Sequence, residues 1–130
     1  MAIKLTNDMR NALLNGPITN NLGNSTLRVY SGSAPSTANA APSGTLLVEI
    51  TGIYFDAPNN GTAPLTSTYL AEATVGGIAG YARLLDTYGT SVAIQGNVGT
   101  AATCDFVISK GTFGIENVTL TLATLIQPAE

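Results

Sequence analysis

Alternation of apolar and polar residues dominates the chain after about residue 25. It is clearest over 118–123, where valine and leucine alternate with threonine and alanine. A period of two places the two sets of side chains on opposite faces of a strand, and threonine is favoured on the exposed face. The pattern predicts strands over 27–31, 46–51, 92–98 and 118–123, and weaker signals predict four more over 53–56, 65–74, 79–86 and 103–109.

Turn signals separate these segments. Asn59-Asn60-Gly61 contains Asn-Gly, a strong hairpin cue, and the prolines on either side favour edge strands. Further turns are predicted at Gly76-Gly77, Asp86-Thr87-Tyr88-Gly89 and Lys110-Gly111. About eight short strands with regular turns predict an all-β protein, an antiparallel β-sandwich or jelly-roll-like domain with a short N-terminal helix.

The helix is predicted over 6–15, with a threonine to cap its start and Gly16-Pro17 to end it. Leu5, Met9 and Leu13 recur at i, i+4 and i+8 and form one apolar stripe. A helix of about ten residues is not stable alone in water, so the stripe must pack on something. It packs either on its own domain or on a neighbouring subunit, and the three residues are candidate interface residues.

The segment Ser31–Gly44 is long, polar and rich in small residues. Such a composition suits either a disordered linker or an ordered surface loop. The segment before it is too short to be a domain, so we expect an ordered surface loop or an arm within one domain. The length of 130 residues also favours one domain. The expected organisation is an N-terminal arm and helix over 1–24 and a single β-sandwich domain over 25–130.

Composition argues against an enzyme. The chain has no His and a single Cys, and threonine outnumbers all charged residues together. Without His, neither Ser-His-Asp nor Cys-His catalysis nor a Cys/His zinc site can be built. The interior acids occupy predicted turns or polar strand positions: Glu49, Asp56, Glu72, Asp86, Asp105 and Glu116. Asp56 with the asparagines after it faintly resembles a calcium loop that lacks its closing acid, and turn chemistry explains it more simply. We therefore predict no catalytic residue, cofactor or metal.

Charge and hydropathy limit the partners. The net charge is −3 and the five cations are scattered, so no basic stripe exists to bind nucleic acid. No apolar run reaches the length of a membrane span, and the first eight residues lack the apolar core of a signal peptide. We expect a protein made in the cytoplasm. Cys104 is expected on one strand face with Phe106 and Ile108 as a buried apolar residue, the alternatives being an intermolecular disulfide or a reactive thiol.

Aromatic residues supply one candidate contact surface. The alternation places Tyr30 on the same strand face as Arg28, and Tyr81 on the same face as Arg83. Arginine beside tyrosine on an outer face is typical of protein contact surfaces. The alternative is ordinary amphipathic packing within the chain. The four residues are candidate interface residues.

Three stretches resemble a family of small virion proteins encoded by tailed bacteriophages. They are 8–14 (DMRNALL), 27–47 (LRVYSGSAPSTANAAPSGTLL) and 77–99 (GIAGYARLLDTYGTSVAIQGNVG). The resemblance implies a structural role, and it brings no catalytic residues. It best suits a capsid decoration, or cement, protein. Such proteins are small, mostly β, and often sit as trimers on the major capsid protein.

These expectations define the predicted function. The protein would bind the outside of the major capsid protein shell and stabilise it, as a homo-oligomer, with a trimer favoured. It would be made in the host cytoplasm and located on the capsid surface of the virion. The alternative is a tail, head–tail connector or receptor-binding component with a β-sandwich head. Receptor binding would use the 31–44 loop, which lacks the aromatic and acidic residues expected of a sugar-binding loop.

Overall fold

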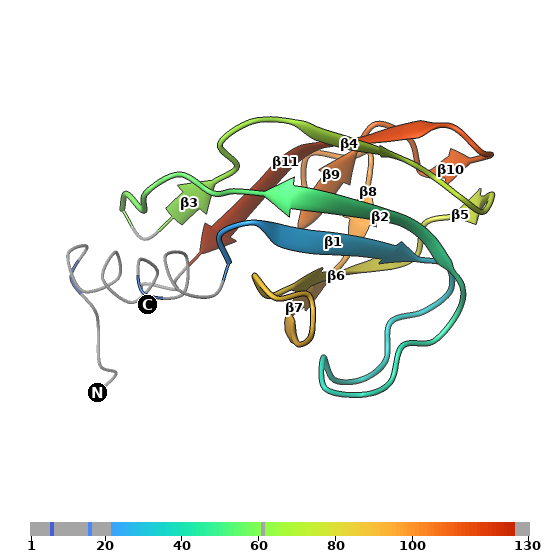
Figure 1. Ribbon diagram of the computed structural model, residues 1–130, viewed down its shortest axis with the longest axis horizontal. Coiled ribbons are helices and arrows are strands. Elements are labelled where there is room, and N and C mark those ends of the chain that lie inside the picture. Colours follow the sequence, from blue (N-terminus) through green and yellow to red (C-terminus); the bar gives the residue numbers. More distant parts are fainter. Residues whose placement is uncertain (1–5, 7–15, 17–21, 61, 127–130) are drawn as a thin grey trace.

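The computed structural model describes residues 6, 16, 22–60 and 62–126 (Figure 1). The elements of this part of the chain are eleven β-strands, mostly in antiparallel sheets. They are β1 (Ser25–Tyr30), β2 (Leu46–Ile53), β3 (Thr62–Pro64), β4 (Tyr69–Glu72), β5 (Gly77–Ile78), β6 (Tyr81–Leu85), β7 (Val92–Gly96), β8 (Val98–Gly99), β9 (Phe106–Ile108), β10 (Thr112–Phe113) and β11 (Asn117–Ile126). The prediction of a β-rich protein is confirmed. The predicted helix over 6–15 lies outside the described residues, apart from residue 6.

The first sheet has the strand order β2-β1-β6-β7, and all three of its pairings are antiparallel. In the β1–β6 pair, Arg28 lies opposite Arg83 and Tyr30 lies opposite Tyr81. Leu27 and the other alternate residues of β1 point into the core. The strands predicted over 27–31 and 46–51 are confirmed.

The second sheet is organised around β11, the longest strand. β3 and β4 pair with its two ends, and β9 pairs with its middle. β8 then joins β9 in the one parallel pairing among the named strands of the described chain. β5 and β10 form a separate two-stranded pair. Side chains of both larger sheets form one core, whose fully buried members include Leu27, Val29, Ile50, Leu84, Ile108, Val118 and Leu120.

The segment 92–98 is not one strand, as predicted, but two. The chain leaves the first sheet at Gly96, and Val98 enters the second. Asn97 and Asp105 fix this change of sheet: Asn97 N donates to Asp105 Oδ2 at 3.0 Å, and Asp105 N donates to Asn97 Oδ1 at 2.6 Å. A Cβ at Gly96 would crowd the Asp105 carboxylate. Local side-chain bonds of this kind compete with continued strand pairing.

Two predicted hairpin turns are confirmed. Asn59 and Thr62 exchange backbone hydrogen bonds of 2.8 and 3.0 Å, and Asn60 has a φ of 51°, as the turn requires. At the second turn, Asp86 N donates to Ser91 O at 2.9 Å between β6 and β7.

Other boundaries differ from the sequence prediction. The segment 65–74 holds only the four residues of β4, and residues 53 and 55 fall at the end of β2 and on an isolated bridge. Cys104 is half-buried in the turn before β9 and is not a buried strand residue. The hydrogen bonds between Asn97 and Asp105 hold this turn, and β9 therefore begins only at Phe106.

Candidate functional site

A row of polar side chains crosses the outer face of the first sheet. Registers place Glu49, Arg28, Arg83 and Gln95 opposite one another on β2, β1, β6 and β7. Arg28 Nε lies 2.6 Å from Glu49 Oε2, and Arg83 Nε donates to Gln95 Oε1 at 2.9 Å. The hydrogen bond that Arg28 donates to the Glu49 carboxylate is the main reason why the pKa of Arg28 is raised. These bonds offset the repulsion expected of two arginines directly opposite each other.

Arg83 is 2% exposed and has no carboxylate partner among the described residues. Its guanidinium instead donates to Gln95 and, at 3.5 Å, to the carbonyl of Thr37. Its Cζ lies 5.9 Å from the centroid of the Tyr81 ring. Burying a charge is costly unless it is hydrogen-bonded, and the carbonyl, amide and aromatic ring reduce that cost.

Tyr81 links this row to the 31–44 loop. Its ring stacks on Tyr30 with centroids 5.1 Å apart and an interplanar angle of 11°. Its hydroxyl donates to the carbonyl of Ser43 at 2.7 Å and accepts from the amide of Ser43 at 2.9 Å. Gln95 Nε2 binds the loop at a second point, donating to the carbonyl of Pro35 at 2.9 Å.

The two ends of the loop are joined to each other. Ser31 N donates to Thr45 O, and Thr45 N donates to Ser31 Oγ, both at 3.0 Å. Gly44 has a φ of 74°, which favours glycine. Gly80 lies so close to the loop that a Cβ there would overlap the carbonyl of Gly32. The prediction of an ordered surface loop is confirmed. We call the side chains of Arg28, Tyr30, Tyr81, Arg83 and Gln95 the platform, and residues 31–44 the platform loop.

The structure therefore places the four candidate residues of the predicted contact face on one side of the first sheet, but that side is not open. Tyr30, Tyr81 and Arg83 are buried, at 6%, 1% and 2% exposure. The physical reason is the platform loop, whose carbonyls and Ser43 amide hydrogen-bond to platform side chains. Arg28 remains partly exposed. The other candidate interface residues, Leu5, Met9 and Leu13, lie outside the described residues.

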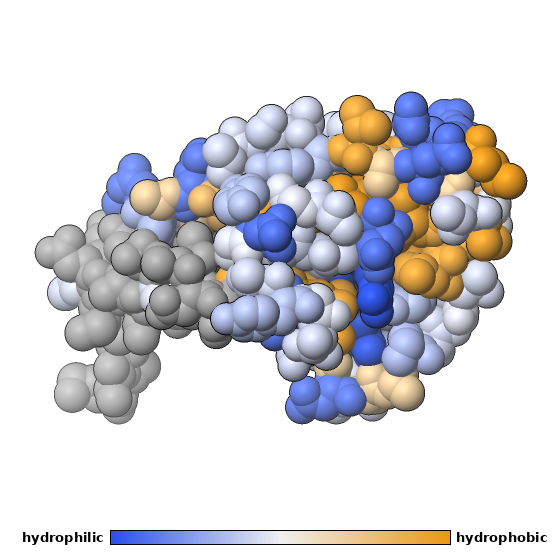
Figure 2. Space-filling model, in the orientation of Figure 1, coloured by the Kyte–Doolittle hydropathy of each residue, from blue (hydrophilic) through white to orange (hydrophobic). Residues whose placement is uncertain are grey.

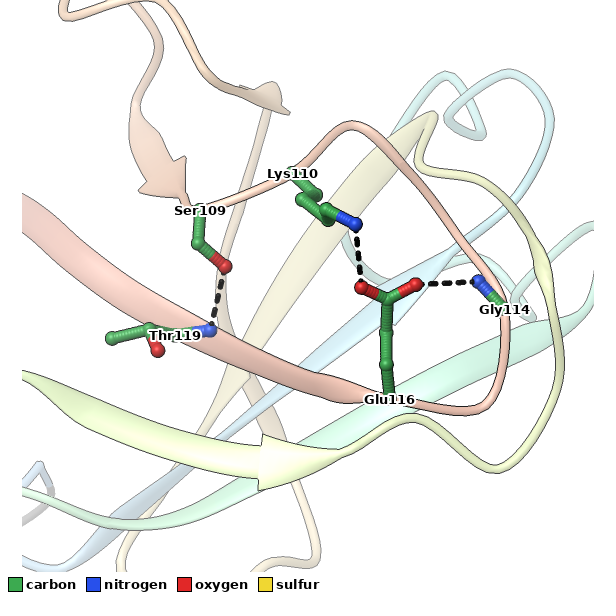
Figure 3. A network of polar contacts seen from close by, with 5 residues as sticks. All are labelled: Ser109, Lys110, Gly114, Glu116 and Thr119. Atoms are coloured by element: carbon green, nitrogen blue, oxygen red, sulfur yellow. Dashed lines mark hydrogen bonds and ion pairs between the residues drawn. The ribbon is translucent and has the colours of Figure 1, made fainter.

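The interior acids have structural surroundings. Glu116 Oε1 lies 2.7 Å from Lys110 Nζ, and Glu116 Oε2 accepts from the amide of Gly114 at 3.0 Å (Figure 3). Lys110 is the main reason why the pKa of Glu116 is lowered. Asp86 Oδ1 accepts from the amide of Thr90 at 3.1 Å in its turn. None of the six interior acids is buried.

The described part of the chain has neither a metal-binding cluster of side chains nor a membrane-spanning helix. No three His, Cys, Asp or Glu residues in that part come together in a group that could hold a metal ion. No helix found there has the length and apolar character needed to cross a membrane.

One exposed surface was not predicted. Leu46, Val75, Ile78 and Ile115 are 37%, 42%, 67% and 72% exposed. Figure 2 shows apolar side chains gathering where β4, β5 and β10 lie. We call these four residues the apolar end. Alternation does not reveal it, because β5 and β10 have only two residues each. A glycine before an isoleucine, as at Gly77-Ile78 and Gly114-Ile115, is no signal either, because the isoleucine of Gly52-Ile53 is fully buried.

Comparison with known proteins gives no match: no protein-family model, no curated protein and no solved structure is similar to this chain.

Proposed function

We propose that this chain is a bacteriophage virion structural protein, a capsid decoration protein that binds the outside of the major capsid protein shell and stabilises it. The observation that carries the proposal is where the phage-like stretches lie. Residues 27–47 supply β1, the platform loop and the start of β2, and residues 77–99 supply β5 to β8. The two stretches meet at the β1–β6 pairing. The larger part of the two stretches, which supplies β1, the start of β2, β6 and β7, therefore belongs to one structural unit, the first sheet, whereas β5 and β8 lie outside it.

This unit suits a contact surface. The platform loop has no charged residue, and its backbone is already held by Tyr81, Arg83 and Gln95. A loop that is ordered before binding loses little conformational entropy in the complex. A modest interface repeated over many lattice positions stabilises a shell through multivalency. The proposal includes a β-sandwich arrangement of the two larger sheets and a trimer on the capsid surface, made in the host cytoplasm.

Copy number in purified virions tests the proposal. Quantitative mass spectrometry should give a number that scales with the capsid lattice. A single ring of subunits, roughly a dozen or fewer, would instead place the protein in a connector or tail, since such parts follow closed cyclic symmetry. Absence from virions would overturn every virion role.

A further inference from the structure

The apolar end is a fixed surface. Gly77 lies opposite Phe113 and Ile78 opposite Thr112 in the β5–β10 pair, so Val75 and Gly76 come next to the turn that carries Ile115, with Ile78 at the other end of the same pair. A Cβ on Gly76 would lie 3.4 Å from the Cα of Gly114, so the two turns are in close contact. A solvent-exposed group of large apolar side chains on ordered turns is typical of a contact site.

Ion pairs and hydrogen bonds hold the backbone beneath Ile115. Glu116 binds both Lys110 and the amide of Gly114, on either side of the turn (Figure 3). Ser109 N donates to Thr119 O at 2.9 Å, which closes the base of the same turn. Ile115 therefore lies exposed on a turn that these bonds hold in place, and its side chain adds no buried contact to the core.

Charge indicates what would cover this surface. The described chain has three cations, of which Arg28 and Lys110 are ion-paired and Arg83 is buried. Four of its six acids form no ion pair: Asp56, Glu72, Asp86 and Asp105. Of these four acids, Glu72 lies near the apolar end, because it pairs across β4 and β11 with Asn117, two residues after Ile115. A partner that is apolar on one side and carries cations complements this surface.

The chain itself contains such a segment. Residues 1–21 carry Lys4 and Arg10 against a single acid, Asp8, whereas 22–126 carry three cations and six acids. The predicted helix and the two residues before it combine these cations with the apolar stripe of Leu5, Met9 and Leu13. We infer that the apolar end of one copy binds the N-terminal segment, residues 4–15, of a second copy of this chain.

The positions of the two surfaces favour exchange between copies. The N-terminal segment joins the body next to Ser25, which lies opposite Ile53, whereas Tyr30 at the far end of β1 lies opposite Leu46. The N-terminal segment and the apolar end are thus attached at opposite ends of β1. Repetition of such a head-to-tail contact closes into a ring when the rotation between copies permits it. The inference rests on the self-association included in the proposed function.

Cross-linking of mixed copies tests the exchange. In a full-length Cys104→Ser background, one copy carries Met9→Cys and a coexpressed copy carries Ile115→Cys. Mild oxidation should give a disulfide-linked dimer of the two. In the control, Tyr88→Cys replaces Ile115→Cys. Tyr88 is 77% exposed and lies in the β6–β7 turn, away from the apolar end. Thr87 of this turn donates a hydrogen bond to the carbonyl of Gly23, near the start of β1. No dimer above this control would overturn the inference.

Two further outcomes are decisive. A chain with both cysteines that cross-links only within itself, while mixed copies do not, would show that the segment covers its own body and would overturn the inference. Light scattering should show that Ile78→Ser with Ile115→Ser lowers the oligomer mass about threefold, from trimer to monomer, whereas Tyr88→Ser leaves it unchanged. The virion copy number is independent of both results. A lattice-scaled copy number without the cross-link would overturn the exchange and leave the decoration role standing.

Discussion

At the scale of single residues, Tyr81 and Arg83 bury a strand face that the sequence marks as polar. All five residues of β6 are buried: Ala82 and Leu84 lie in the core, Tyr81 and Arg83 lie under the platform loop, and Leu85 lies opposite Thr26 at the other end of β1. The strand pattern could place Tyr81 on one face with Arg83, and Tyr30 on one face with Arg28, but the β1–β6 register that joins the two pairs came from the structure. The pattern could not show that a loop would cover that face, because the covering bonds come from backbone carbonyls, which carry no side-chain signal.

Tyr81→Phe should release the platform loop and leave the sheets folded. The variant keeps the stacked ring but leaves the amide and carbonyl of Ser43 without their partner, a loss of about 1–3 kcal/mol. Hydrogen exchange should become faster over residues 32–44 and stay slow in β1 and β6. Tyr88→Phe is the control, because Tyr88 is largely exposed. Equal exchange in the two variants would contradict the role of the hydroxyl.

The Glu116–Lys110 pair should make the free energy of unfolding depend on pH in the acidic range. The pKa of Glu116 is lowered in the folded chain from its ordinary value of 4.5, so its contribution is present above that value. It is lost as pH falls through the lower folded pKa. Glu116→Gln should flatten this part of the stability curve in denaturant unfolding, and added salt should have a similar, weaker effect on the wild type. Glu72→Gln is the control, and coincident curves for the two variants would contradict the prediction.

At the scale of elements, the sequence predicts strands best where one face is buried and the other is wet. The alternations at β2 and at the start of β11 are of this kind, and both strands were placed within a few residues. A register shift between Leu120 and Leu122 then turns Ala123, expected on the exposed face, into the core. The parallel β8–β9 pair was missed because Asn97 and Asp105 redirect the chain through side-chain bonds to backbone, which period-two alternation does not reveal. β5 and β10 are too short to show a period.

Gly80→Ala should disrupt the platform loop as an element. The added methyl group would overlap the Gly32 carbonyl, and backbone cannot move aside as a flexible side chain does. We expect a loss of about 2 kcal/mol or more in unfolding free energy. Gly111→Ala is the matched control, because nothing lies within 4 Å of its added Cβ. Similar unfolding midpoints for both variants would contradict the close packing of the loop on the β5–β6 connection.

At the scale of the whole molecule, the platform loop and the apolar end are separate surfaces with separate expected partners. The loop would face the capsid and the apolar end would face another copy, so the two contacts can be weakened independently. Asn39→Glu with Ala41→Glu places charges on exposed loop positions whose side chains make no hydrogen bond within the described chain. Desolvating these charges against the shell should reduce virion occupancy by tenfold or more, at about 1.4 kcal/mol for each factor of ten. Oligomer mass and unfolding midpoint should stay at their wild-type values, because neither position supports the platform.

Ala102→Glu adds a charge to an exposed loop elsewhere and should leave occupancy unchanged. Equal occupancy for the loop variant and this control would show that the capsid contact lies on another face.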